Sequence, residues 1–202
     1  MSHDEQGGRK TLSIRGAATP QPSAQRPAAQ FAFLAPFAFM ADHVAMAERQ
    51  ALPDPRGAAV HARLAVEAMV RWLYDHDSAL REPYDDHLAA LTAEPSFLKL
   101  AGTMIRTKID LVRKIGNRAA HPGQFAPAQA VSALRELFHI GLWFATRYSL
   151  TPPLADLTFS ADLLPRADAG PQTSPDQVRA LEDSAEKARE ALEAERKARL
   201  DR

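Results

Sequence analysis

Apolar residues recur at three- and four-residue steps along much of this chain, a spacing that indicates one buried face of an α-helix. The clearest segment predicts a helix over 55–76, with Asp54 as its N-cap and Pro55 as its first helical residue. Its stripe consists of Ala58, Ala62, Ala65, Val66, Met69, Trp72 and Leu73. The small residues at its start would let a neighbouring helix approach closely.

Weaker versions of the same pattern predict helices over 37–51, from near Asp85, after Pro95, over 103–119 and over 127–149. No segment alternates convincingly between apolar and polar residues, as a half-buried strand would. The sequence therefore predicts an all-α fold, with a bundle of four or five helices in residues 31–150.

The segments flanking this bundle have a different composition. Residues 1–30 are polar, rich in Gly, Ala, Pro and Gln, and without an apolar face, so we expect a disordered lead. Order should begin with four phenylalanines, either as a strap packed on the core or as a partner-binding patch. These are Phe31, Phe33, Phe37 and Phe39. Residues 151–173 form a proline-rich spacer before a charged helix over 174–202.

The charged helix has a clear start. Ser174 and Gln177 form a capping box, and Pro175 stands at the first helical position. Its apolar residues follow a heptad for about two repeats, which is compatible with a solvated helix or with a short coiled coil. They are Val178, Leu181, Ala185, Ala188 and Leu192.

Composition narrows the function classes. The chain of 202 residues has no cysteine, which excludes disulfides and thiolate zinc sites, and its formal net charge is zero. Only a local patch, not the whole chain, can therefore attract nucleic acid electrostatically. There is no apolar run long enough for a membrane span and no apolar signal core, so we expect a cytoplasmic protein without membrane attachment. No phosphate loop, nucleophile motif or persuasive metal-ligand spacing occurs, so we expect no cofactor and no metal.

A local basic patch does occur between residues 99 and 118. It consists of Lys99, Arg106, Lys108, Arg113, Lys114 and Arg118, against a single acid, Asp110. Either these cations form a solvated face suited to the C-terminal end of the helix dipole, or they contact the phosphates of DNA or RNA. The patch has no interleaved exposed aromatic residues, so stacking on bases is not indicated.

The stretch "RKIGNRAAHPG" at the end of this patch carries the most chemistry. Gly116 and Asn117 either break the helix or lie within it, whereas His121 should end it because Pro122 follows. Asn117 and His121 would then lie one turn apart on one face, able to bind a phosphate or exchange a proton. Equally, Asn117 could satisfy loose backbone carbonyls while His121 caps the helix end.

Arg63 and Glu67 lie four residues apart within 55–76. The Arg-before-Glu order is the weaker one for a local pair, so we interpret both as structural residues that act across the bundle.

Two stretches together resemble a known family. "AERQALPDPRGAAVHARLAVEAMVRWLY" and "LVRKIGNRAAHPG", with the closing helix "ALRELFHIGLWFATRY", resemble a helical domain of unknown function. That domain stands at the N-terminus of type I restriction enzyme R (HsdR-type) subunits and related DEAD/DEAH helicases. The resemblance covers about 31–150 and implies a prokaryotic defence system, with other restriction or helicase subunits as partners.

The same region resembles, more distantly, the HEPN superfamily of helical bundles, whose ribonucleases carry Arg-x4-His. Aligned on His121, the polar position is Asn117, but Gly116 stands where the arginine would be. The resemblance therefore implies the bundle and its tendency to form homodimers, and we predict a non-catalytic adaptor that binds nucleic acid or a partner. The alternatives are a dimeric ribonuclease using Asn117 and His121, and a pure dimerisation module.

Overall fold

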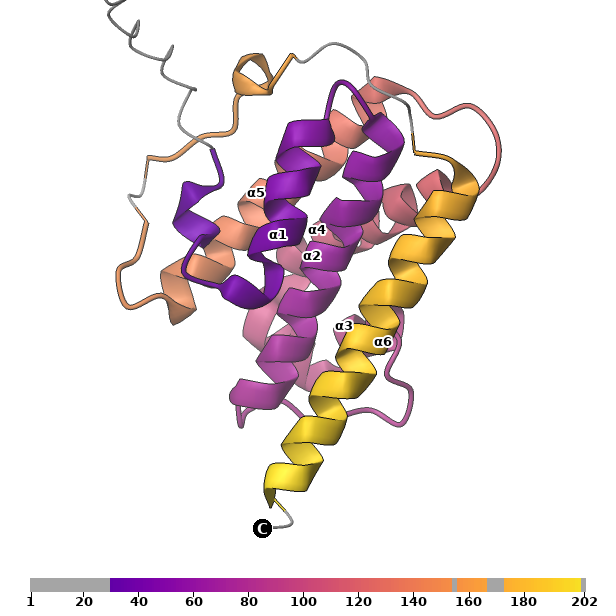
Figure 1. The fold of residues 1–202 in the computed structure, drawn as a ribbon. Coiled ribbons are helices and arrows are strands. Elements are labelled where there is room, and N and C mark those ends of the chain that lie inside the picture. The colour runs from indigo at the N-terminus through magenta and orange to yellow at the C-terminus, as the bar shows by residue number, and fades with distance from the viewer. Residues whose placement is uncertain (1–29, 154–155, 167–172, 201–202) are drawn as a thin grey trace, which may run out of the picture.

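The computed structural model describes residues 30–153, 156–166 and 173–200, and within these ranges it contains helices and no strand (Figure 1). The α-helices are α1 (Ala38–Gln50), α2 (Pro55–His76), α3 (Leu88–Ala93), α4 (Pro95–Ala120), α5 (Pro127–Tyr148) and α6 (Pro175–Leu200). Two short 3-10 helices are η1 (Ala32–Leu34) and η2 (Ala161–Leu163). The predicted all-α fold is confirmed, while the predicted disordered lead lies almost wholly outside the described residues.

Capping residues fix most helix boundaries where they were expected. The Asp54 carboxylate accepts a hydrogen bond from the Gly57 N–H at 3.2 Å, at the start of α2. Ser174 and Gln177 form the predicted reciprocal capping box of α6, at 2.8 and 3.2 Å. Only α3 begins later than expected, because the Asp85 carboxylate accepts the His87 N–H in a local turn that competes with the helix.

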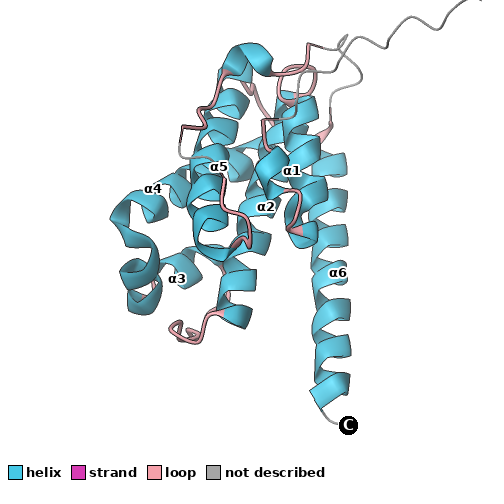
Figure 2. Cartoon of the chain, turned by 90° about the vertical axis from the view of Figure 1, so that its left-hand side faces the viewer, coloured by secondary structure: helices cyan, strands magenta, loops and turns pink. Residues whose placement is uncertain are grey.

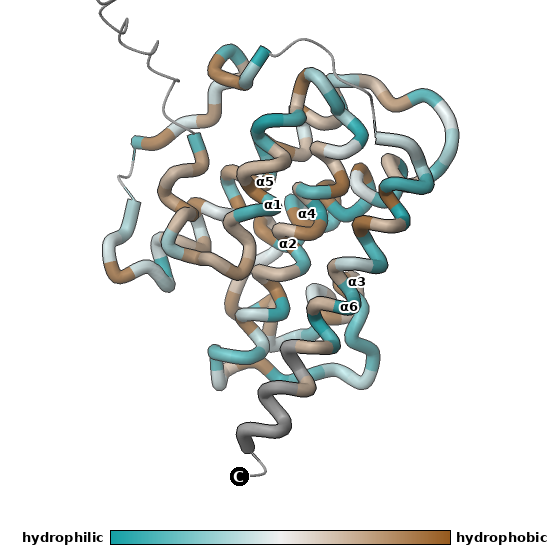
Figure 3. The backbone as a smooth tube through the Cα atoms, viewed as in Figure 1, coloured by the Kyte–Doolittle hydropathy of each residue, from teal (hydrophilic) through white to brown (hydrophobic). Residues whose placement is uncertain are grey.

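The core lies where α1, α4 and α5 meet α2 (Figure 1). Brown and teal residues alternate along these helices and along the coloured part of α6, as expected of helices with one apolar face (Figure 3). Every residue that the sequence placed inward on α4 is buried: Ile105, Ile109, Val112, Ile115 and Ala119. The start of α2 is buried almost all round, because small residues there admit two neighbouring helices.

Gly116 does not break α4. Its backbone is helical, and a Cβ added to it would lie 2.6 Å from the Arg63 Cβ and 3.1 Å from the Ala59 carbonyl oxygen of α2. Glycine here lets the two helices approach closely. The interruption in α4 lies instead at Gly102, whose φ of 75° and ψ of 164° depart from helical values.

The N-terminal phenylalanines form the predicted strap on the core. Phe31 and Phe37 are buried and pack edge-to-face on Phe138 and Phe144, with ring centroids 5.6 and 4.8 Å apart. Phe39 is the most exposed of the four, at 36%. The strap therefore belongs to the bundle, with Phe31 and Phe37 buried and Phe33 and Phe39 partly in contact with solvent.

Helix α6 lies along α2 and α4 and then runs past the bundle (Figure 2). Val178 is fully buried and Ala185 packs on the core, but Ala188 is exposed, while Glu182 and Arg189 are partly buried. This departs from the predicted heptad, because a straight helix of 3.6 residues per turn drifts away from a 3.5-residue repeat. Within the described ranges, no helix combines the length and the apolar character of a membrane span.

Candidate functional site

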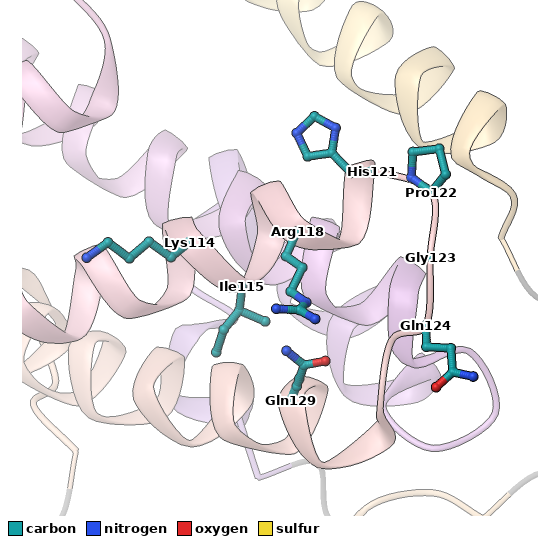
Figure 4. A pocket seen from close by; sticks show the side chains of 8 residues that line it. All are labelled: Lys114, Ile115, Arg118, His121, Pro122, Gly123, Gln124 and Gln129. Carbon is teal, nitrogen blue, oxygen red and sulfur yellow. The ribbon is translucent and has the colours of Figure 1, made fainter.

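A pocket of about 570 Å³ opens at the C-terminal end of α4 (Figure 4). Its lining residues are Lys114, Ile115, Arg118, His121, Pro122, Gly123, Gln124 and Gln129. In Figure 4, Arg118 extends from α4 toward Gln129 of α5, while His121 points outward from the end of the helix. Two cations, an imidazole and two amides thus line this pocket, and no acid does. Such a lining offers hydrogen-bond donors to an anion.

The shape of the pocket depends on how α4 ends. His121 adopts an extended backbone before Pro122, with ψ of 150°, and so ends the helix as predicted. Arg56, from the first turn of α2, donates to the carbonyl oxygens of Ala119, His121 (2.8 Å) and Gly123 (2.7 Å). Its guanidinium therefore satisfies orphan carbonyls and carries positive charge to the negative end of the α4 dipole.

Arg56 was missed by the sequence analysis, although one signal was present. A cation in the first turn of a helix is unfavourable beside that helix's own dipole, which suggests a partner elsewhere. The imidazole of His121, by contrast, makes no hydrogen bond among the described residues. His121 thus contributes to the end of α4 through its backbone carbonyl, which accepts from Arg56, and not through its ring.

The predicted basic patch is only partly available for binding. Lys108 pairs with Glu136 of α5, and Arg113 and Lys114 both pair with Asp110, at 2.6 and 2.7 Å. Hydrogen bonds from Lys114 and Arg113 lower the pKa of Asp110, so its carboxylate neutralises part of the patch. The side chains of Lys99, Arg106 and Arg118 make no ion pair or hydrogen bond in the part of the chain that the structure describes. Of these three, Arg118 lies in the pocket.

Asn117 and His121 are not joined by any hydrogen bond of the described residues. The Asn117 side-chain oxygen accepts from Arg63 at 2.6 Å, and the same guanidinium pairs with Glu182 of α6 at 2.8 Å. Asn117 is therefore held on the α6 side of α4. Glu67 pairs locally with Arg71, at 3.1 Å, so Arg63 acts across the bundle as expected and Glu67 does not.

A pair of histidines lies inside the bundle, between α1 and α2. The Nδ1 atoms of His43 and His61 are 3.1 Å apart, and His61 is only 5% exposed. Burial, and then the neighbouring His43, lower the pKa of His61 to about 4, although Asp54 opposes the shift. The two imidazoles therefore form a hydrogen bond in the packed interior between α1 and α2.

The described residues contain one cluster with metal-ligand chemistry, namely Asp85, Asp86 and His87, and all three side chains are exposed. Arg71 and Arg189 both pair with the Asp86 carboxylate, at 3.4 Å. This arrangement is that of an ion-pair group on the surface.

Comparisons with protein-family models, curated proteins and solved structures gave no significant match.

Proposed function

We propose that this chain is a non-catalytic helical domain that binds nucleic-acid phosphates at the end of α4, as part of a prokaryotic type I restriction-like defence system. The observation that carries the proposal is the pocket lined by Arg118, His121 and Lys114 without an acid; Asp110, which pairs with Lys114, lies outside the lining. The defence context, with restriction or helicase subunits as partners, rests on the sequence resemblance alone.

The side chains of the pocket favour contact with the phosphate backbone of a nucleic acid over contact with its bases. Arginine and lysine neutralise phosphates without reading sequence, and Arg118 retains its full donor capacity. The lining has no aromatic side chain on which a base could stack. We therefore expect weak binding that is insensitive to sequence and falls steeply with added salt.

The test compares two double variants of equal charge. Lys114→Ala with Arg118→Ala removes the pocket cations, whereas Lys99→Ala with Arg106→Ala removes two exposed cations outside the pocket. Oligonucleotide affinity of the first variant should fall about tenfold or more, and the slope of log affinity against log salt should decrease by up to about 2. The second variant should lose much less.

Equal losses in the two variants would assign binding to the whole patch instead of the pocket. No binding by the unmodified chain at low salt would retire the nucleic-acid proposal in favour of docking to a partner subunit.

A ribonuclease remains the second candidate, because the pocket contains Arg118 together with His121 although the two are out of register with the HEPN motif. An imidazole can exchange a proton while a guanidinium stabilises a charged phosphate. Against it, Asn117 is engaged by Arg63. RNA cleavage by the purified chain that disappears in His121→Ala, with sedimentation unchanged, would replace the adaptor proposal. Sedimentation also tests the homodimer.

A further inference from the structure

We propose a second anion site, formed by Arg63 and Asn117 beneath α6, in which the Glu182 carboxylate occupies the position of a nucleic-acid phosphate. Helix α6 would thus be an internal competitor of the strand that binds in the neighbouring pocket. This inference rests on the proposed phosphate binding at the end of α4.

The contacts of the Arg63 guanidinium are suited to an anion. One terminal nitrogen donates to the Asn117 side-chain oxygen at 2.6 Å, and the other pairs with Glu182 at 2.8 Å. The Nε of Arg63 is buried and has no hydrogen-bond partner among the described residues. A guanidinium held at one end by an amide and still carrying an unused donor is suited to an oxyanion, and phosphate and carboxylate oxygens are equivalent partners for it.

The site at Arg63 and Asn117 lies next to the open pocket on α4. Asn117 is adjacent in sequence to Arg118, and Lys114 lies about one turn earlier on α4. The covered site and the open pocket therefore occupy neighbouring strips of one helix end. A phosphate chain crossing α4 would meet Lys114 and Arg118 in the open and would next reach Arg63, where Glu182 now lies.

Helix α6 has a small apolar contact with the bundle. Within the described part of α6, Val178 is the fully buried apolar side chain and Ala185 packs on the core while partly exposed, and the ion pairs Arg63–Glu182 and Arg189–Asp86 add to these contacts. Arg189 pairs with Asp86 at 3.4 Å, and both partners are partly exposed. Exposed ion pairs contribute little to stability and weaken in salt, so an anion of higher charge density can displace such a helix.

The test uses the full chain and a labelled single-stranded oligonucleotide at low salt. Glu182→Gln removes the competing charge, and Asp183→Asn is the matched control because it removes the same charge from an exposed neighbour. We expect Glu182→Gln to bind several-fold more tightly than the unmodified chain, and Asp183→Asn to bind as the unmodified chain does. Adding Arg63→Gln to Glu182→Gln should abolish the gain.

A second measurement follows α6 directly. Amide hydrogen exchange within 178–189 should increase when the oligonucleotide is added to the unmodified chain, whereas exchange in α5 should stay constant. This readout does not depend on whether Arg63→Gln folds.

The outcomes separate the two proposals. If the unmodified chain binds but Glu182→Gln behaves like Asp183→Asn, or if α6 exchange does not rise, the second site is refuted and the pocket stands. If neither the unmodified chain nor Glu182→Gln binds, the proposed function itself fails. Binding by Glu182→Gln alone would support the site at Arg63 and would retire the open pocket as a nucleic-acid site of the unmodified chain.

Discussion

Helix α2 has two kinds of contact with its neighbours, and a single residue takes part in both. The Cβ of Arg63 lies against Gly116, where α2 and α4 approach so closely that no side chain fits between them. The tip of the same side chain lies in the α6 contact, where it pairs with Glu182 while remaining partly exposed. We call the first region the inner seam, formed by α1, α2 and α4, and the second the outer seam, formed by α6.

The difference between the seams is one of physical mechanism. The inner seam depends on shape, because small residues and buried apolar side chains allow only one arrangement of the helices. The outer seam depends on charge, which is tolerant of geometry and sensitive to salt and competing anions. The bundle is therefore expected to persist while α6 moves, and four changes of decreasing size test this contrast.

The largest effect should follow acidification of the inner seam. The pKa of His61 is lowered from 6.5 to about 4, so the folded chain binds this proton less readily than the unfolded chain. The free energy of unfolding is therefore highest above about pH 6.5, where His61 is neutral in both states. It decreases as the pH falls toward 4, by about 3 kcal/mol in total. Urea unfolding as a function of pH measures it.

His61→Gln should flatten this part of the stability profile, while His121→Gln, at an exposed position, should leave it unchanged. Burial also lowers the pKa of His43, so His43→Gln should flatten the profile in part. A profile of His61→Gln as steep as that of the unmodified chain would show that another group senses the acid.

The next effect concerns the closest approach in the inner seam. Gly116→Ala should cost about 2 kcal/mol of unfolding free energy, because its Cβ would meet the Arg63 Cβ at 2.6 Å and a backbone oxygen at 3.1 Å. Gly141→Ala is the control, since the three atoms nearest its Cβ, the closest at 2.7 Å, belong to the Leu34 side chain and none to a backbone. Equal costs at the two glycines would mean that α2 and α4 can separate freely.

A smaller change in unfolding free energy is expected where Arg56 of α2 contacts the end of α4. Arg56→Ala should cost about 1–2 kcal/mol, because it leaves the carbonyl oxygens of Ala119, His121 and Gly123 without their donor. Hydrogen exchange should rise most in residues 119–125, at the end of α4 and in the following loop. Arg106→Ala, which removes an exposed cation without a described partner, should leave both measurements unchanged.

The smallest effect should occur in the outer seam. Glu182→Gln should change the unfolding free energy by less than about 1 kcal/mol, as for other partly exposed ion pairs. Thermal unfolding of the variant and of the unmodified chain measures this difference, provided that each unfolds in a single transition. A loss as large as that of Gly116→Ala would mean that α6 is part of the core, and the contrast between the seams would fail.

Much of the fold was predictable because helical periodicity is local. The inward faces of α2 and α4, the Asp54 cap and the Ser174–Gln177 capping box follow from residues within one or two turns of each other. The seam of α6 was predicted less well. Ala188 fits the heptad but lies in solvent, since the bundle, not a second coiled-coil strand, determines which side of α6 is buried.

The candidate site was predictable only in its chemistry. The sequence alone determined that cations, Asn117 and His121 gather at the end of one helix, because they lie in one short stretch. Only the tertiary structure decided their partners: Arg56 binds carbonyl oxygens between 119 and 123, Arg63 contacts both Asn117 and Glu182, and Asp110 pairs with Lys114. Apart from the Asp110 pair, these contacts join different helices. A charge has no preferred partner until packing brings one within a few ångströms, whereas an apolar stripe is directed inward by its own helix.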